Sequence, residues 1–430
     1  MQSEVDVLVI GAGPYGLSLA SHLSGVGIEH RIFGRSMEFW QAGMPEGMHL
    51  KSDGFASNLR DPQRRFSLAR FCKENSIAYQ DLGRPVALDA FVKYGVEFQK
   101  RIVPYLEAQK VELLTLGARG FTATLQDGRS AAARRVVIAS GLSGFSHIPA
   151  EVKHLPSALL SHSSDHSSLR RFKGKKLIVL GAGASAVDLA VLAQDSGADV
   201  TLLSRATSIP FHTQMQLPRP LWERMRNPVS GIGPSWRSRF FAEYPWLFRR
   251  LPQAKRLSIV RNYLGPAGGW FMKDRLDAVH VVNGCAIAGA TPENSGLKLS
   301  IAQRNGRTRD LRADHVIAAT GFKVDLRRLT FLAPELRARI STAEHAPILH
   351  SDFGTSVSGL YFVGPAAANS FGPVMRFVYG ADFTSRHVAR HLGRLKPAEG
   401  STSSGQPSES QHLLPAEPSR SSAWNQNLIS

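Results

Sequence analysis

The chain has 430 residues, which is enough for two or three domains and a large core. Its composition, 43% hydrophobic and 20% charged, is typical of a globular protein, and a formal net charge of +18 is compatible with anionic ligands, a membrane surface or nucleic acid. Its two cysteines, Cys72 and Cys285, lie far apart in sequence and form no CxxC pair. This spacing argues against a disulfide framework, a cysteine metal site of the usual kind and a dithiol redox centre.

Residues 5–20, VDVLVIGAGPYGLSLA, have the pattern of a strand, a tight turn and a helix. A mostly apolar run leads into Gly11, Gly13 and Gly16, and an apolar segment without breakers follows. In a dinucleotide-binding turn the first glycine allows the turn, the second lets the backbone approach a pyrophosphate, and the third lets the helix pack against the strand. We therefore predict a dinucleotide site here, with its phosphate charge at the helix N-terminus.

The next strand and loop depart from the usual dinucleotide pattern. Such a fold normally ends its second strand with Asp or Glu to hold the ribose, but residues 29–33 are followed by Gly34 and Arg35. We expect backbone groups or other side chains to hold the ribose instead. From Trp40 to residue 71 the sequence has turn residues and little periodicity, and it offers Lys51 and Asn58. A loop this long is usually functional, although a solvated surface excursion is the alternative.

The opening pattern returns at residues 176–193, KLIVLGAGASAVDLAVLA. Gly181, Gly183 and Ala186 repeat the fingerprint with alanine in the last small position. Two such units in one chain imply two bound dinucleotides, one a carrier and one a reductant. The following strand, residues 199–203, ends at Ser204 and Arg205. An arginine at that point suits the 2′-phosphate of NADP, the alternative being an ordinary surface arginine.

Residues 209–270 are rich in both aromatic residues and arginine. We expect a helical insertion that buries its aromatic side chains over the active site. A membrane-surface or nucleic-acid patch is the alternative interpretation. Because the basic residues are spread through the chain without a recognised nucleic-acid module, we predict no nucleic-acid partner.

The C-terminal third contains two further candidate segments and a biased tail. Residues 314–322, DHVIAATGF, read as a strand that ends in small residues, and a second strand with a glycine-rich loop and a helix follows at 359–392. Residues 396–430 turn to Ser, Gln, Pro and Glu, which predicts a disordered tail. His154, His162 and His166 with Asp165 lie in a Ser- and Lys-rich segment without ligand spacing, so we predict no metal site.

The three motifs GAGPYG, GAGASA and DHVIAATGF, in this order, resemble the class B flavoprotein monooxygenases. This superfamily includes flavin-containing monooxygenases, ornithine and lysine N-hydroxylases and Baeyer–Villiger enzymes, and the resemblance covers about residues 5–392. The segment LKSDGFASNLRDP is similar to the N-hydroxylase segment beside the flavin, and Asn58 matches the flavin-edge asparagine of flavin-containing monooxygenases. At His162–Ser163 the linker signature FxGxxxHS lacks its Phe and Gly, which departs from the Baeyer–Villiger and typical flavin-containing monooxygenase patterns.

The resemblance implies an enzyme in which NADPH reduces FAD and a C4a-hydroperoxyflavin passes one oxygen atom from O2 to a small N- or S-containing substrate. It implies Lys51 and Asn58 as catalytic contacts at the flavin edge. The cofactor-binding residues that we predict are Gly11, Gly13, Pro14, Gly16, Arg35, Trp40, Gly181, Gly183, Ser185, Arg205, Thr320, Gly321, Gly364, Asn369, Phe371 and Gly372. The alternatives are a reductase without oxygenation, an FAD-dependent urate hydroxylase and a non-catalytic, membrane-peripheral nucleotide-binding protein.

The predicted fold class is α/β, with an FAD domain, an inserted NADPH domain, both Rossmann-like, and a helical insertion. We place the first part of the FAD domain at 1–150, the NADPH domain at 151–320 with the insertion at about 209–270, and the last part of the FAD domain at 321–395. Acidic residues interrupt the N-terminus where a signal peptide would be apolar, so a cytoplasmic location is expected. The predicted partners are a small-molecule substrate and O2, with a membrane surface and a homo-oligomer left open.

Overall fold

The computed structural model describes residues 4–304 and 306–395 of the chain. The predicted disordered tail, residues 396–430, lies outside the described residues.

The first sheet has six strands in the order β2–β1–β5–β4–β3, and β16 also pairs with β5. β1, β2 and β16 run parallel to their neighbours, whereas β3, β4 and the first half of β5 are antiparallel. The strands are β1 (Val5–Ile10), β2 (His30–Phe33), β3 (Val111–Gly117), β4 (Gly120–Leu125), β5 (Ser130–Ile138) and β16 (Leu360–Phe362). The β5–β16 pairing brings the C-terminal part of the chain back into the N-terminal sheet.

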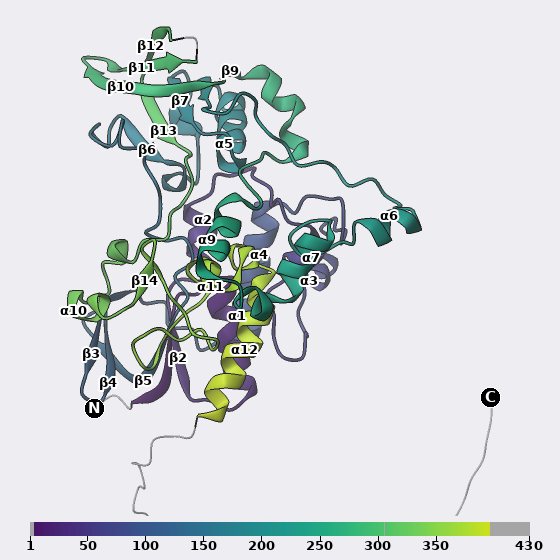
Figure 1. The fold of residues 1–430 in the computed structure, drawn as a ribbon, viewed down its shortest axis with the longest axis vertical. Coiled ribbons are helices and arrows are strands. Elements are labelled where there is room, and N and C mark those ends of the chain that lie inside the picture. Colours follow the sequence, from purple (N-terminus) through teal and green to yellow (C-terminus); the bar gives the residue numbers. More distant parts are fainter. Residues whose placement is uncertain (1–3, 305, 396–430) are drawn as a thin grey trace, which may run out of the picture. The chain divides into compact units, whose positions relative to one another are not determined.

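Helices from both ends of the chain belong to this first unit. Figure 1 shows α1 (Pro14–Gly25) beside α12 (Gly380–Arg394), and the two helices are in contact. The Tyr15 hydroxyl on α1 donates to the carbonyl oxygens of Met375 and Phe377, at 3.0 and 2.9 Å, which fixes the two chain segments together. The remaining helices of this unit are α2 (Glu38–Ala42), α3 (Leu68–Glu74), α4 (Leu88–Ile102), α10 (Pro334–Ala338) and α11 (Ala368–Phe371).

The second sheet is a five-stranded parallel sheet in the order β6–β13–β7–β8–β9. Its strands are β6 (Leu160–His162), β7 (Lys176–Leu180), β8 (Asp199–Leu203), β9 (His280–Val282) and β13 (His315–Ala318). One face packs against α5 (Ala184–Asp195) in an apolar cluster that includes Val187 and Leu202. A second apolar cluster joins the sheet to three antiparallel strands. These strands are β10 (Cys285–Glu293), β11 (Gly296–Gln303) and β12 (Thr308–Ala313). A separate small hairpin pairs β14 (Thr342–Ala343) with β15 (Ala346–Pro347).

The aromatic, basic segment folds as four helices and is closed at its base. The helices are α6 (Leu221–Arg226), α7 (Trp236–Glu243), α8 (Pro245–Phe248) and α9 (Gln253–Asn262). At the base, the His212 amide donates to the Gly268 carbonyl at 2.9 Å, and the Gly268 amide donates to the Pro210 carbonyl at 2.8 Å.

The prediction that this insertion buries its aromatic side chains is half wrong. Phe241 and Phe248 are buried, but Trp222, Trp236 and Trp246 are 61%, 59% and 46% exposed. The helices are short, so each can bury only one face, and the remaining aromatic residues are left on the outside.

The predicted α/β class with a double dinucleotide-binding fold and a helical insertion is confirmed, while the domain boundaries stay predictions. None of the helices in the described ranges combines the length and the apolar character that a membrane crossing requires.

Candidate active site

In the first fingerprint each of the three glycines has its own structural role. Gly11 has a φ of +115°, and a Cβ atom there would overlap the carbonyl oxygen of Ala139. A Cβ at Gly16 would overlap the carbonyl oxygen of Gly11, so the close approach of α1 to the turn requires glycine. Gly13 has no atom within 4 Å of its Cβ direction, which leaves open space where α1 begins at Pro14. The turn is therefore shaped to admit a phosphate group at the helix N-terminus.

The end of β2 carries no acidic residue, as the sequence indicated. Gly34 has a φ of +132°, and the exposed Arg35 pairs with Glu38 at 3.5 Å. The half-buried Trp40 ring packs edge-on against Phe91 of α4, with ring centroids 4.7 Å apart. Gly34 lies against the first turn, since a Cβ atom there would be 3.1 Å from the Ala12 amide nitrogen. The predicted cofactor contacts of Arg35 and Trp40 stay predictions.

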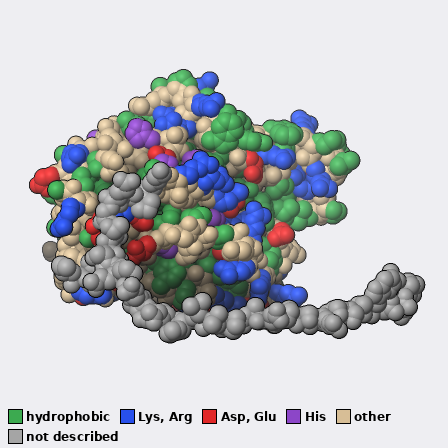
Figure 2. All heavy atoms as spheres, turned by 90° about the horizontal axis from the view of Figure 1, so that it is seen from below, with side chains coloured by type: hydrophobic (Ala, Val, Ile, Leu, Met, Phe, Trp, Pro, Cys, Tyr) green, Lys and Arg blue, Asp and Glu red, His purple; other side chains and the backbone are tan. Residues whose placement is uncertain are grey.

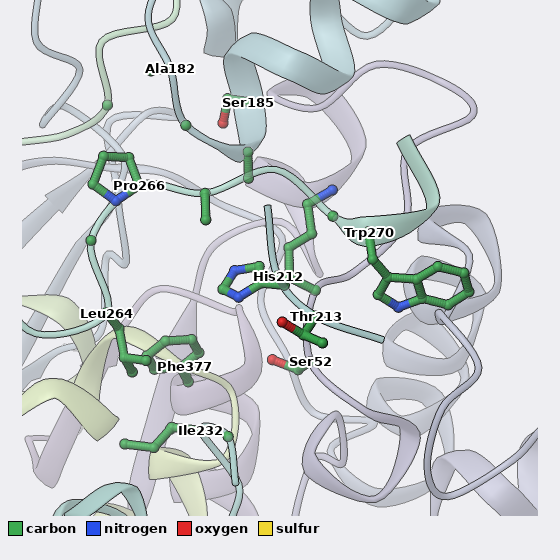
Figure 3. A pocket seen from close by; sticks show the side chains of 18 of the residues that line it. Ser52, Ala182, Ser185, His212, Thr213, Ile232, Leu264, Pro266, Trp270 and Phe377 are labelled. Carbon is green, nitrogen blue, oxygen red and sulfur yellow. The ribbon is translucent and has the colours of Figure 1, made fainter. Parts of the chain in front are cut away.

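The second fingerprint repeats this geometry with one addition. Gly181 has a φ of +145°, and a Cβ atom there would overlap the carbonyl oxygen of Ala319. A Cβ at Gly183 would lie 3.0 Å from Pro266, because the loop that ends the insertion passes over this turn. Ser185 lies in the first turn of α5, and Figure 3 shows Ser185 and Pro266 facing the same space. The second turn is thus partly covered by the chain itself.

Beyond the second fingerprint, the segment after β8 presents a cation to the same region. Arg205 is exposed and lies two residues after the strand ends at Leu203. The Ser204 hydroxyl accepts from the Ala206 amide at 3.1 Å, which fixes the backbone on both sides of Arg205. Its position is therefore suited to the 2′-phosphate of a nucleotide that lies across the second fingerprint.

A cavity of about 1530 Å³ connects the second fingerprint to the first unit. The walls include the loop at residues 50–53, the fingerprint at 180–185, and parts of the insertion at 212–235 and 263–271 (Figure 3). Shorter segments at 83–85, 147–151, 205–206 and 319–323 also contribute. The predicted site residues that line it are Lys51, Gly181, Gly183, Ser185, Arg205, Thr320 and Gly321. The other predicted residues do not line this cavity; they are Asn58, Gly11, Gly13, Pro14, Gly16, Arg35, Trp40, Gly364, Asn369, Phe371 and Gly372.

Lys51 forms an ion pair with Asp188, a residue that we did not predict. The Lys51 ammonium group donates to both carboxylate oxygens of Asp188, at 2.8 and 2.6 Å, and lies 4.7 Å from the centre of the Phe271 ring. Asp188 is on α5 and its side chain is fully buried, while Lys51 is 18% exposed. Burial raises the pKa of Asp188, and the charge of Lys51 opposes that rise. The pair joins the long loop of the first unit to the nucleotide helix of the second.

The Asn58 side chain forms its hydrogen bonds with nearby backbone groups. Its side-chain oxygen accepts from the Leu68 amide at 2.8 Å, and its amide group donates to the Phe55 carbonyl at 2.9 Å. With an exposed fraction of 8%, Asn58 holds together the loop that carries Lys51. Its predicted role at a flavin edge stays a prediction.

The cavity lining includes His212, which was not singled out from the sequence, and Asp53, which belongs to the same loop as Lys51. Burial lowers the pKa of His212, and the nearby charge of Lys51 lowers it further. Burial also raises the pKa of Asp53, although the carboxylate accepts from the Gly83 amide at 3.0 Å. Figure 3 shows the His212 ring projecting into the middle of the cavity near Thr213. A neutral imidazole in this position can accept a proton at neutral pH.

The C-terminal loop lies against α1 and the insertion. Gly364 has a φ of +74° and lies 3.4 Å from the Tyr15 ring, measured from the Cβ that a side chain would place there. Phe371 is 1% exposed and stacks on Phe353, with ring centroids 3.8 Å apart. Its side chain is therefore part of the core, which leaves the half-buried Asn369 as the more accessible side chain of this loop.

The histidines of the linker bond to protein groups. The His154 ring bonds to the Ala290 carbonyl and the His162 ring to the Gly321 carbonyl, while His166 and His315 share the Ser161 hydroxyl. Within the described part of the chain no group of three or more His, Cys, Asp or Glu side chains could hold a metal ion.

Residues 5–228 match the family described as "Pyridine nucleotide-disulphide oxidoreductase", which is more than half of the chain. The chain belongs to this family. The sequence match includes both fingerprints and the loop that carries Lys51. The expected membership of a two-dinucleotide oxidoreductase group is therefore confirmed at the level of the family.

Solved structures with the same fold include several from this wider group of oxidoreductases. An ornithine N-hydroxylase from Kutzneria sp. 744 is 17% identical, with a TM-score of 0.73 over 91% of this chain and 99% of that one. An L-lysine 6-monooxygenase from Pseudomonas syringae is 18% identical, with a TM-score of 0.69 over the same shares. A bacillithiol disulfide reductase from Staphylococcus aureus is 17% identical, with a TM-score of 0.61 over 91% and 98%. At these identities the comparison establishes a shared fold.

This pyridine nucleotide-disulphide oxidoreductase has no pair of cysteines close enough for dithiol chemistry within the chain. Cys72 is buried on α3, and Cys285 is buried at the start of β10 in the second unit. Burial raises the pKa of both thiols, which disfavours the reactive thiolate form. Neither cysteine lines the cavity.

Proposed function

We propose that this protein is an FAD-dependent, NADPH-consuming monooxygenase that transfers one oxygen atom from O2 to the nitrogen or sulfur of a small substrate. The observation that carries the proposal is the cavity, which joins a nucleotide fingerprint to the Lys51 loop and offers neither a dithiol nor an activated nucleophile. Such a site suits chemistry that belongs to the cofactor, with the protein supplying binding, orientation and electrostatics.

The two fingerprints have the shapes that the two cofactors need. We assign FAD to the first turn, where the open space at Gly13 and the N-terminus of α1 would receive its pyrophosphate. We assign NADPH to the second turn, with Arg205 holding its 2′-phosphate. When bound, the two cofactors would supply hydride transfer and reaction with O2, which is chemistry that the protein side chains lack.

Lys51 and Asp188 act as positioning residues in this proposal. Their ion pair ties the loop of the first unit to α5 of the second, so the two nucleotide sites keep one relative orientation. An error of about 1 Å in such an arrangement can lower a rate by about a hundredfold. The Lys51 side chain is 18% exposed and lines the cavity. A direct contact with substrate stays a prediction.

His212 gives the cavity a group that can hold a proton. An amine reacts as a nucleophile only after it has lost its proton, and a neutral imidazole beside it can accept that proton. The lowered pKa of His212 keeps the ring neutral at neutral pH.

Apolar side chains form part of the cavity wall. Figure 3 shows Trp270 on one side, and Leu264, Ile232 and Phe377 grouped on another. Exclusion of water protects reactive oxygen chemistry from being discharged before transfer.

The proposal is tested by following the oxygen atoms. The purified protein is reconstituted with FAD and given NADPH, isotopically labelled O2 and a panel of primary amines, thiols and thioethers. We expect at least one substrate to acquire one labelled atom while release of hydrogen peroxide falls. Label found only in hydrogen peroxide and water, across the whole panel, would contradict oxygenation.

A reductase is the second candidate, because a bacillithiol disulfide reductase shares this fold. In that case NADPH oxidation would accelerate with an added disulfide or quinone acceptor when O2 is removed. The monooxygenase proposal instead expects NADPH consumption to stop after one reduction under those conditions.

A further inference from the structure

The outer side of the insertion gathers most of the large hydrophobic side chains that the described residues expose. Eight of the thirteen such side chains lie between residues 217 and 246. We call these eight the α6–α8 face; they are Leu217, Leu221, Trp222, Met225, Trp236, Phe240, Tyr244 and Trp246. Most of these side chains are on the order of half exposed. Because all eight lie between residues 217 and 246, they belong to one segment and are not a scatter of single residues.

The α6–α8 face is held in place by bonds within the insertion. The Trp236 indole donates to the Met225 carbonyl at 2.9 Å, which ties α7 to the end of α6. The Arg219 guanidinium is almost buried and donates to the Asn227 carbonyl at 2.6 Å, which secures the other side of α6. Beneath the face, the Ser238 hydroxyl bonds to the Tyr263 hydroxyl at 2.6 Å. The apolar side chains are therefore presented by a defined scaffold.

The same segment is strongly basic. Residues 217–250 contain seven arginines and two glutamates, a net charge of +5. Both glutamates are occupied, since Glu223 pairs with Arg219 at 3.4 Å and Glu243 accepts from the Tyr379 hydroxyl at 2.7 Å. Figure 2 shows hydrophobic and basic side chains next to each other on the part that projects at the right, where Figure 1 places α6.

Several of these arginines lie over the aromatic rings of the face. Arg239 lies 5.6 Å from the Trp236 ring centre and Arg250 lies 5.5 Å from that of Trp246. One ring face of each tryptophan is thus already covered, which leaves less surface for stacking a nucleic-acid base. A second copy of the chain would bring two faces of like charge together, which disfavours self-association through this surface.

We propose that the α6–α8 face docks the protein on an anionic phospholipid surface. Tryptophan and tyrosine side chains favour the boundary between headgroups and acyl chains, and neighbouring arginines attract anionic headgroups. The aromatic rings and Met225 enter this boundary while the guanidinium groups stay at the level of the phosphates. This inference does not rest on the proposed function, because none of the eight residues lines the cavity.

The test is co-sedimentation of the full chain with vesicles of phosphatidylcholine, and with vesicles of equal phosphatidylcholine and phosphatidylglycerol. We expect binding to the anionic vesicles that weakens as salt is raised, with a blue shift of tryptophan fluorescence, and little binding to the neutral ones. The variant R224Q/R226Q/R239Q should lower the partition coefficient by about a hundredfold, since each arginine near the surface contributes about fivefold. The variant W222Q/M225Q/W246Q should lower it by about tenfold or more and reduce the blue shift, since Trp236 is then the one tryptophan left on the face.

Matched variants elsewhere on the surface separate this face from general charge and apolarity. R119Q/R309Q/R390Q removes three exposed arginines outside the insertion, and V26Q/L113Q/I348Q removes three exposed apolar side chains outside it. Each should change the partition coefficient by less than about threefold, because surface charges beyond about 10 Å are screened. Thermal unfolding checks that all four variants fold.

Three results would overturn the proposal. The first is no binding of the folded chain to anionic vesicles at low salt. The second is equal loss of binding in the matched and the face variants. The third is a face variant that keeps vesicle binding but dissociates an oligomer or abolishes duplex DNA binding, since another occupant would then cover the face.

Discussion

The two nucleotide turns share their glycine geometry but differ in their surroundings. α1 is buried along its first ten residues, and Tyr15 fastens it to the C-terminal segment. The start of α5 is only half-buried and opens on the large cavity, with Pro266 lying over Gly183. This difference fits one site that retains its cofactor through many turnovers and another that exchanges it at each cycle.

The largest effect is expected from Gly16→Val. The new side chain would overlap the Gly11 carbonyl and separate α1 from the turn, so we expect loss of bound FAD and of about 3 kcal/mol or more in unfolding free energy. The measurements are the flavin-to-protein ratio and chemical unfolding. Gly13→Ala is the control, because the methyl group enters open space: the fold should persist while FAD retention weakens. Equal destabilisation by both substitutions would contradict the assigned roles.

The next effect concerns the link between the units. Lys51→Met leaves the buried Asp188 carboxylate without its partner, and we expect a loss of about 3–5 kcal/mol in unfolding free energy at neutral pH. Adding Asp188→Leu should recover much of that stability, since the unpaired charge is removed as well. Denaturant unfolding of the two single variants and the double variant measures the coupling, and strictly additive losses would argue against a buried pair.

The third prediction is a pH dependence. Because the pKa of His212 lies below the ordinary value of about 6.5, kcat/KM should fall as pH drops through that lower value, where the ring gains its proton. His212→Asn should reduce kcat/KM by about a hundredfold at neutral pH and remove this acid limb. His147→Asn is the control, since His147 also lines the cavity and has a lowered pKa. An acid limb that persists in the His212 variant would exclude this residue as the proton acceptor.

The smallest of these effects compares the two strand-end arginines. Arg205→Ala should raise the KM for NADPH by about tenfold to thirtyfold and leave that for NADH nearly unchanged, because a charge-assisted bond to the 2′-phosphate contributes about 1.5–2 kcal/mol. Arg35→Ala should leave both KM values unchanged, since that arginine lies in the first unit beside Glu38. If Arg35→Ala instead raises the KM for NADPH, the two cofactor assignments are reversed.

Local sequence patterns were sufficient to predict the parts of the fold that are made of consecutive residues. Each of these features depends on about twenty residues, within which strand, turn and helix follow one another. They are the two fingerprints, the replacement of the usual acidic residue after the second strand by Gly34 and Arg35, and the position of Arg205. The helical nature of residues 209–270 was likewise visible in composition.

Features that depend on distant contacts were missed. The partner of Lys51 is Asp188, which lies on a helix 137 positions later. The one sequence signal was that this aspartate stands alone in the apolar run AVDLAVLA, where a buried charge requires a partner of opposite charge. The position of Pro266 over Gly183 and the exposure of Trp222 and Trp236 depend on how short helices pack, which no periodicity reports.

The pairing of β16 with β5 has a consequence for synthesis of the chain on the ribosome. The second sheet has all its strands once β13 has been synthesised, at residue 318. The first sheet is completed only by β16. Its helix α1 also needs Met375 and Phe377, whose carbonyl oxygens accept from Tyr15. The inserted unit can therefore finish folding while the enclosing unit is still incomplete. Under the proposed cofactor assignment, FAD would therefore bind late in synthesis. Truncations near the C-terminal helix would then yield a chain with a folded second unit and no FAD in the first turn.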